Sequence, residues 1–149
     1  MSGAPIATLS LEVAFDDVLQ IGPGPEGHRG VAFITGGRLE GERIAASVLG
    51  GEDWFTMRAD GSLDIDVRLT LHSDDEAFLT LAYQGRMTGS KEALAAFARG
   101  EPMRRGDYAI ETQAVIGCGD PRYQWLDGLA LVGTGTQTPA GPVYHLSAA

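Results

Sequence analysis

Asp66, Arg68 and Tyr83 are the residues of this sequence that best suit proton-transfer chemistry. A carboxylate beside an arginine stays ionised, so Asp66 would act as a base only toward an acidic substrate proton. Arg68 would hold an enolate, phenolate or carboxylate through paired hydrogen bonds. Tyr83 would donate a hydrogen bond to a developing oxyanion. The trio predicts a cofactor-free lyase, isomerase or cyclase acting on a small aromatic or polyketide-like compound. The alternative is a structural ion pair.

The segment from Leu63 to Leu71 decides where Asp66 and Arg68 point. Apolar and polar residues alternate strictly along it, which is typical of a half-buried β-strand. If Asp74-Asp75 is a two-residue turn, the polar face of this strand also carries Tyr83 from the returning strand. A shift of pairing by one residue would reverse that assignment. The polar face therefore lines a ligand cavity or faces solvent, and both alternatives stay open.

Four further residues are candidates for contact with a ligand. Trp54 offers a flat wall for an aromatic ring or, alternatively, belongs to the core. Tyr123 and Trp125 are two positions apart on an expected strand, so they share a face that is either a core shelf or a cavity wall. His72 lies at the end of the strand on the face of the predicted acid–base residues, either in the pocket or at its rim.

Nine segments carry strand signals and one carries helix signals. The strands are expected at residues 7–15, 31–35, 38–49, 54–58, 62–72, 77–84, 107–116, 123–133 and 143–147. The helix is expected from Ser90, a favourable N-cap, to Arg99, with Gly100 just after it. Short turns favour antiparallel hairpins, and closure removes exposed strand edges. The sequence predicts a mainly β protein, an antiparallel closed β-barrel in a single domain of residues 1–149.

Composition excludes several classes of partner. The net charge of −9 disfavours nucleic acid and anionic membranes. No apolar run is long enough to span a bilayer, and the single cysteine, Cys118, leaves no internal disulfide, so we expect a cytoplasmic protein. The three histidines are scattered, and no nucleotide-binding glycine loop is present, so we expect neither a metal nor a cofactor.

A homodimer is also expected. One amphipathic helix covers only part of the outside of a barrel. The aliphatic face of the strand from Leu63 to Leu71 would therefore need a partner, and a second copy of the chain is the simplest one.

Several short segments, taken in order, resemble one uncharacterised protein family. They are Ile34-Thr35-Gly36-Gly37, Glu40-Gly41, Gly50-Gly51-Glu52-Asp53-Trp54, Asp66-Val67-Arg68-Leu69-Thr70-Leu71, Asp74-Asp75, Ala98-Arg99-Gly100-Glu101-Pro102 and Asp120-Pro121-Arg122-Tyr123-Gln124-Trp125-Leu126. The family is known as domain of unknown function 3237, or uncharacterised protein family 0311. The resemblance implies a lipocalin-like barrel with a central cavity and carries over no established reaction.

The sequence departs from the family pattern at two places. Asp127 stands where the family usually has asparagine, and Ile110-Glu111-Thr112 stands where it often has Phe-Arg-Thr. If these positions reach the cavity, the cavity of this protein is more acidic than that of its relatives.

Two functions from different classes remain. The favoured one is the cofactor-free enzyme, and the alternative is a barrel that carries or senses a small aromatic ligand without changing it. A filled barrel would exclude both. The two functions differ in whether Asp66, Arg68 and Tyr83 converge on open space.

Overall fold

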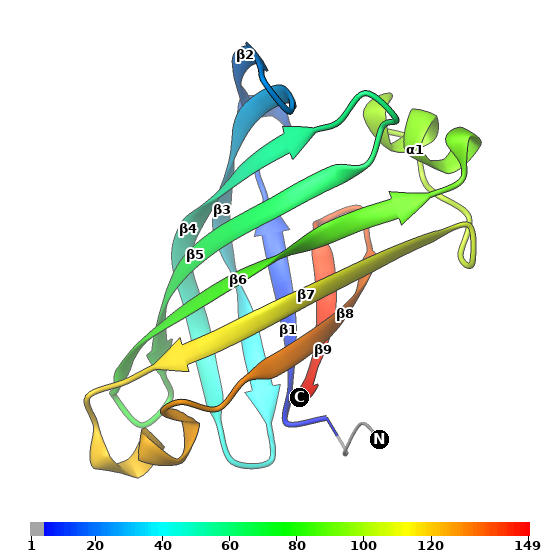
Figure 1. Cartoon of the computed structure of the whole chain (residues 1–149). Coiled ribbons are helices and arrows are strands. Elements are labelled where there is room, and N and C mark those ends of the chain that lie inside the picture. Colours follow the sequence, from blue (N-terminus) through cyan, green and yellow to red (C-terminus); the bar gives the residue numbers. More distant parts are fainter. Residues whose placement is uncertain (1–4) are drawn as a thin grey trace.

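Strand β1 (Ala7–Val13) pairs with two other strands, and this double pairing closes the barrel. It runs antiparallel to β9 (Pro142–Ala148) on one side and to β3 (Gly27–Gly41) on the other. The ring passes from β1 through β3 to β9, and the short strand β2 (Leu19–Gly24) pairs only with β3. Figure 1 shows this ring in a computed structural model that describes residues 5–149. The predicted antiparallel closed barrel is confirmed.

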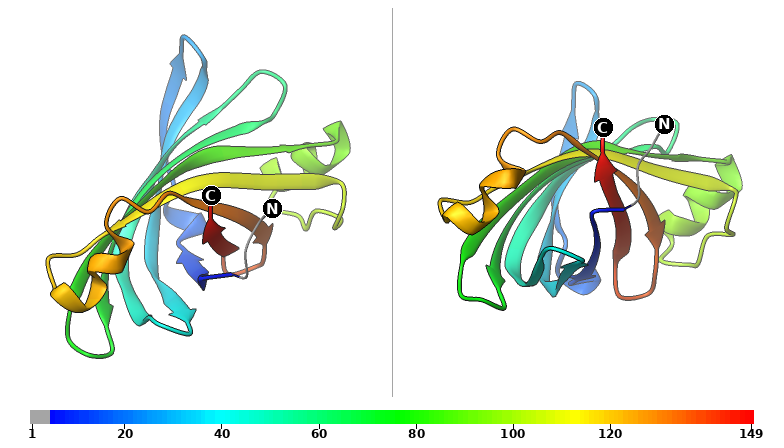
Figure 2. Two further views of the ribbon diagram at one scale, coloured as in Figure 1. Left: turned by 60° about the horizontal axis from the view of Figure 1, so that its bottom comes forward. Right: turned by 90° about the horizontal axis from the view of Figure 1, so that it is seen from below.

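The remaining elements complete the wall and its two ends. They are β4 (Ala45–Met57), β5 (Leu63–Ser73), β6 (Phe78–Gly89), α1 (Lys91–Ala98), β7 (Tyr108–Gly117), β8 (Leu131–Gln137) and the 3-10 helices η1 (Phe15–Asp17) and η2 (Pro121–Leu126). Helix α1 lies at one end of the barrel and η2 at the other (Figure 2). The predicted helix start is confirmed, because the Ser90 hydroxyl accepts the Ala93 N–H at 3.0 Å.

Three stretches of the predicted pattern differ from the structure. The strands predicted at 31–35, 38–49 and 54–58 are two longer strands, because β3 runs through Gly36-Gly37 to Gly41 and β4 runs through Gly50-Gly51. Strand β2 lies where no strand is predicted. The strand predicted at 123–133 begins only at Leu131. Asp120 accepts the Arg122 N–H at 2.9 Å, and Pro121 provides a proline in the first turn, so the chain enters η2 instead.

The hairpin between β5 and β6 decides which side chains point inward. The Ser73 N–H donates to the Ala77 carbonyl at 2.7 Å, which leaves a three-residue loop whose last residue, Glu76, has φ of 79°. A loop with one residue more than expected shifts the pairing by one. Tyr83 therefore lies opposite Val67 rather than sharing a face with the polar residues of β5. The predicted face assignment is wrong.

Glu76 offers a test of this loop. Its left-handed backbone strains a residue that has a Cβ, so Glu76→Gly should raise the free energy of unfolding by about 0.5–1 kcal/mol. Urea unfolding measures the change. Glu76→Ala is the matched control, because it removes the same 3.5 Å contact with His72 but keeps the Cβ. Equal effects of the two substitutions would argue against backbone strain at this position.

The interior of the barrel is apolar. The odd-numbered residues of β5, from Leu63 to Leu71, are buried there. The reason given for a homodimer is therefore wrong, since the aliphatic face is covered by the barrel itself. The homodimer stays a prediction, which sedimentation velocity measures. No helix within residues 5–149 has the length and hydropathy needed to cross a membrane.

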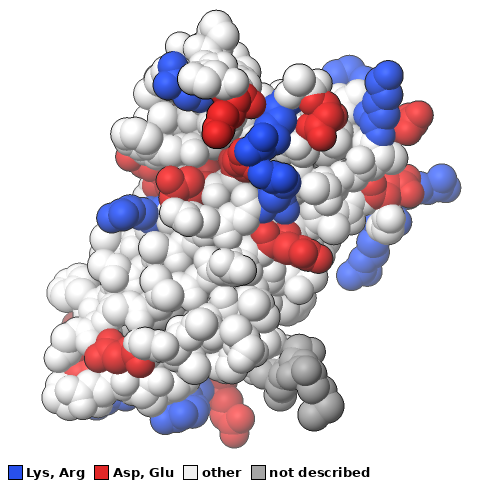
Figure 3. Space-filling model, in the orientation of Figure 1, with Lys and Arg blue, Asp and Glu red and all other residues white. Residues whose placement is uncertain are grey.

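One face of the outer wall carries few charges over its middle. Figure 3 shows a largely uncharged surface there, with acidic and basic side chains gathered toward the two ends. The large apolar residues exposed on strands of this wall include Leu49, Phe78, Val115 and Val132. This surface is separate from the barrel interior.

Candidate functional site

The barrel encloses a cavity of about 630 Å³. We call it the barrel cavity. It reaches the end of the barrel that η1, β2 and α1 surround (Figure 1), and residues from these elements and from the loop after α1 form its rim. Most of its lining is apolar, and three phenylalanines and three methionines contribute to it: Phe15, Phe55, Phe97, Met57, Met87 and Met103. An apolar cavity of this size suits a small organic ligand.

Asp53 is the acidic side chain on the inner wall of this cavity. Pairing between β4 and β5 continues up to Asp53–Val67 and resumes at Thr56–Asp64. In the gap, Asp66 has no partner on β4, and its backbone N–H instead donates to Asp53 Oδ1 at 3.0 Å. The carboxyl group therefore replaces a backbone acceptor of the sheet, and this bond holds it in the wall.

Burial changes the acidity of Asp53. It raises the pKa of the carboxyl from 3.8 to about 7, although the hydrogen bond from the Asp66 N–H works in the opposite direction. A smaller contribution comes from the negative charge of the Asp66 side chain. Near neutral pH the group is therefore present in both protonation states, so it can both donate and accept a proton.

Two tyrosines stand beside Asp53 in the cavity lining. Tyr83 comes from β6 and Tyr144 from β9, and their ring centroids are 4.9 Å apart with the rings tilted by 60°. Burial raises the pKa of both hydroxyls. The neighbouring Tyr144 raises the pKa of Tyr83 further, whereas Tyr83 lowers that of Tyr144, and the Asp53 charge makes a smaller raising contribution to both. Both tyrosines stay protonated, so they are hydrogen-bond donors next to a titrating carboxyl group.

The raised pKa of Asp53 predicts a pH-dependent stability. Between its unfolded value of 3.8 and its folded value of about 7, the folded protein binds the additional proton. The free energy of unfolding should therefore fall as the pH rises through this window. Asp53→Asn keeps an oxygen acceptor for the Asp66 N–H and removes the charge. It should stabilise the protein by about 1–3 kcal/mol near pH 8 and have little effect near pH 4.

Urea unfolding at the two pH values measures this effect. Glu52→Gln is the matched control, because Glu52 is the preceding residue of β4 and is exposed. Its substitution should change stability little at either pH. A stabilisation by Asp53→Asn that is the same at both pH values would contradict the raised pKa.

Comparison with known proteins places the chain in a family. Residues 2–149 match the family described as Protein of unknown function (DUF3237). This chain belongs to that family. A UPF0311 protein of Rhodopseudomonas palustris is 30% identical over 119 residues, which cover 79% of this chain and 78% of that protein. The resemblance noted in the sequence is thus confirmed.

Solved structures share the whole barrel. A conserved protein of unknown function from Rhodopseudomonas palustris superposes with a TM-score of 0.92 at 25% identity, covering 99% of this chain and 97% of the other. A β-barrel like protein from Acinetobacter baumannii gives 0.84 at 27% identity, with coverage of 99% and 94%. An enzyme from Penicillium herquei gives 0.72 at 13% identity, with coverage of 99% and 95%, and this likeness shows the fold alone.

In this DUF3237 protein, three predicted site residues lie on the outer face of the barrel. Asp66 and Arg68 are exposed, since the aliphatic face of β5 points into the barrel and the polar face points outward. Trp54 is 64% exposed, and its Nε1–H donates to Glu52 Oε1 at 3.2 Å. The predicted meeting of Asp66 and Arg68 with Tyr83 therefore does not occur.

The other predicted contact residues lie outside the lining of the barrel cavity. Tyr123 lies in the 3-10 helix η2, and its hydroxyl donates to Asp75 Oδ1 at 2.7 Å. Arg43 lies 3.9 Å from the ring centroid of Trp125, and His72 stacks on Phe78 with centroids 4.5 Å apart. Of the seven residues that the sequence nominates, Tyr83 alone lines the cavity.

The acidic residues at the two departures from the family pattern do not reach the cavity, although Ile110, from the second departure, lines it. Asp127 and Glu111 are both exposed and lie outside its lining. Within residues 5–149, no three His, Cys, Asp or Glu side chains lie together as they would around a metal ion.

Asp53 and Tyr144 are absent from the predicted site. One local signal points to Asp53: Glu52 and Asp53 are consecutive acidic residues in a strand, so one of them must face inward. Tyr144 carries no comparable signal, since its position beside Tyr83 depends on the closure of the barrel through β9.

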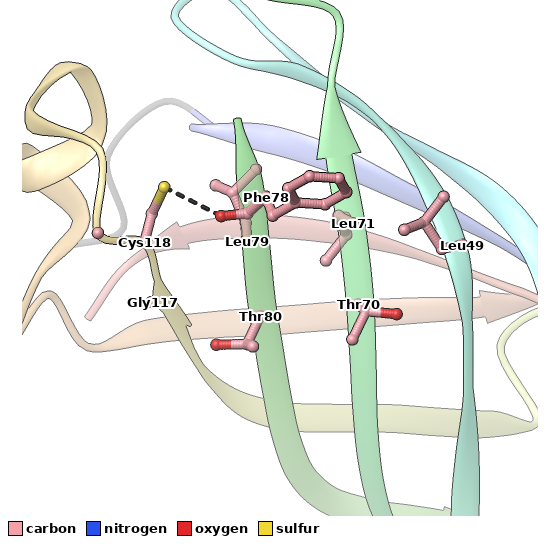
Figure 4. Close-up of a pocket in the computed structure, with 9 residues that line it drawn as sticks. Leu49, Thr70, Leu71, Phe78, Leu79, Thr80, Gly117 and Cys118 are labelled. Carbon is pink, nitrogen blue, oxygen red and sulfur yellow. Dashed lines mark hydrogen bonds between the residues drawn. The ribbon is translucent and has the colours of Figure 1, made fainter. Parts of the chain in front are cut away.

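A second depression lies on the outer wall. Figure 4 shows that it spans β4, β5 and β6 and reaches Cys118, whose thiol donates to the Phe78 carbonyl at 3.2 Å. Its lining is apolar apart from two threonines and this thiol. It therefore lacks the acid–base groups that the barrel cavity has.

Proposed function

We propose that this protein is a cofactor-independent enzyme, a lyase, isomerase or cyclase, that moves a proton on a small aromatic compound in the barrel cavity. One observation carries the proposal: a carboxyl group with a pKa of about 7 is anchored in an apolar cavity beside two tyrosine hydroxyls. Strongly shifted pKa values in a cavity are typical of acid–base catalysts.

Asp53 acts as the proton acceptor and later as the proton donor. Its carboxylate removes a proton from a carbon or hydroxyl group of the substrate, and negative charge develops on a substrate oxygen. The hydroxyls of Tyr83 and Tyr144 donate hydrogen bonds to that oxygen. The protonated Asp53 then returns its proton to another atom of the substrate, which completes an isomerisation or ring closure, or assists a departing group in an elimination.

The fold is compatible with catalysis. The structural neighbour from Penicillium herquei is described as an enzyme, so a barrel of this architecture is used for catalysis in another protein. Because fold alone does not specify chemistry, the argument for this protein rests on Asp53 and its surroundings.

A carrier or sensor of a small aromatic ligand is the second candidate. The apolar lining with its phenylalanine and methionine side chains favours it, since such walls bind rings without requiring chemistry. A carrier, however, gains nothing from an acid–base group that titrates near neutrality. The two candidates therefore differ in whether the cavity removes a proton from a bound compound.

A reactive probe tests the proposal. Nitrobenzisoxazole is a neutral aromatic compound from which a base removes the ring C–H proton. The ring N–O bond then breaks, and the single product is a coloured phenolate that carries a nitrile group on the same ring. We expect the protein to accelerate this elimination at least about a hundredfold over the same concentration of acetate near pH 8. A rate no higher than that of acetate would favour the carrier and count against the enzyme.

A further inference from the structure

We infer that the barrel cavity selects an uncharged ring compound with a hydroxyl or carbonyl group and rejects the corresponding carboxylate. This inference names the ligand class of the proposed site and so rests on the proposed function. The sequence predicts that Arg68 binds an anionic oxygen of the ligand. The inference reverses that expectation, because Arg68 lies on the outer face.

The charge balance of the lining carries the inference. Among residues 5–149, the side chains that line the cavity include no lysine, arginine or histidine. They include three acidic residues, Asp16, Asp53 and Glu101. Glu101 is compensated by an ion pair with Arg99 at the rim, whereas the inner wall carries Asp53. A ligand anion would thus lose its water without meeting a cation, and it would approach a carboxylate.

The polar groups of the inner wall suit a neutral oxygen. Tyr83 and Tyr144 are protonated donors, and Asp53 near neutral pH offers either a donor or an acceptor. A hydroxyl or carbonyl group forms hydrogen bonds with such a set in either protonation state. The ring lies among phenylalanines and methionines, whose flexible thioethers adapt to flat aromatic surfaces.

Three probes with the same naphthalene ring test the inference. They carry a hydroxymethyl, a carboxylate or an aminomethyl group, and isothermal titration calorimetry near pH 8 measures each affinity. We expect the alcohol to bind at least about a hundredfold more tightly than the carboxylate. Equal binding of alcohol and carboxylate would overturn the inference, as would binding of none of the three. An ammonium compound that binds more tightly than the alcohol would overturn the preference for an uncharged ligand.

Variants separate the charge of the cavity from the charge of the whole chain. Asp53→Asn should lower the ratio of the alcohol affinity to the carboxylate affinity at least about tenfold, because it removes the carboxylate that repels the anion. Glu52→Gln removes one charge from an exposed residue of the same strand and should leave the preference unchanged. If Glu52→Gln narrowed the preference as much as Asp53→Asn, net charge would explain it and the inference would fail.

The outcome is distinguishable from that of the proposed function. If the alcohol binds selectively but nitrobenzisoxazole elimination stays at the rate of acetate, the ligand class stands and the catalytic proposal fails. If elimination is fast but the carboxylate binds as well as the alcohol, the ligand class fails and the catalytic proposal stands.

Discussion

Replacing Asp53 with asparagine is expected to lower the rate of nitrobenzisoxazole elimination by about a hundredfold to ten-thousandfold. The substitution keeps an oxygen that can accept the Asp66 N–H, so the cavity wall should keep its shape while the base is lost. The increase of phenolate absorbance with time measures the rate, and circular dichroism checks that the variant is folded. Unchanged elimination in a folded Asp53→Asn protein would remove Asp53 from the mechanism.

The pH dependence of the wild-type rate belongs to the same expectation. The ionised form of Asp53 is the base, so the rate should rise with pH and level off above the pKa of about 7. Asp53→Asn should lose this inflection. Arg68→Ala and Glu52→Gln serve as controls, since both side chains are exposed on the outer face, and their rates should match that of the wild type.

Replacing either cavity tyrosine with phenylalanine should lower the kcat of nitrobenzisoxazole elimination by about a hundredfold while changing its KM little. Each substitution removes one hydroxyl donor, either that of Tyr83 or that of Tyr144, and retains the ring that packs in the wall. The donor acts on charge that develops during the reaction, which is why kcat rather than KM should respond.

Tyr123→Phe is the matched control for these two variants. Its hydroxyl bonds to Asp75 outside the lining of the barrel cavity, so the substitution should lower stability and leave kcat unchanged. A loss of kcat in Tyr123→Phe as large as that in Tyr83→Phe would show that the effect comes from general loosening of the barrel. The tyrosine donors would then have no specific role.

Much of the fold can be predicted from local sequence. Strict alternation from Leu63 to Leu71 identifies a strand because side chains on a strand point to opposite faces in turn. Ser90 identifies a helix start because its hydroxyl satisfies a backbone N–H that the helix leaves free. Short turns between many strands imply antiparallel pairing and closure. The strand, the helix start and the antiparallel hairpins depend on neighbours within a few residues, whereas closure joins β1 to β9 from the other end of the chain.

Which residues of β6 share a face with the polar residues of β5 depends on a single residue of loop length. Ser73 and Ala77 pair across a loop that ends at Glu76, so its odd length reverses the side-chain parity relative to a two-residue turn. Glutamate rarely adopts the left-handed conformation that such a loop requires, so the residue types do not predict a three-residue loop here. The two-residue turn therefore predicts the wrong partner for Asp66 and Arg68, because Tyr83 faces inward while they face outward.

The candidate site itself depends on tertiary structure. Asp53, Tyr83 and Tyr144 come from strands β4, β6 and β9, and the closure of the barrel brings them to one cavity. The pKa of Asp53 rises because residues distant in the sequence remove it from water. Alternation along a strand tells which residues share a face. Whether that face is wet or buried, and so whether a carboxyl group there is a surface charge or an acid–base group, follows from what the rest of the chain places over it.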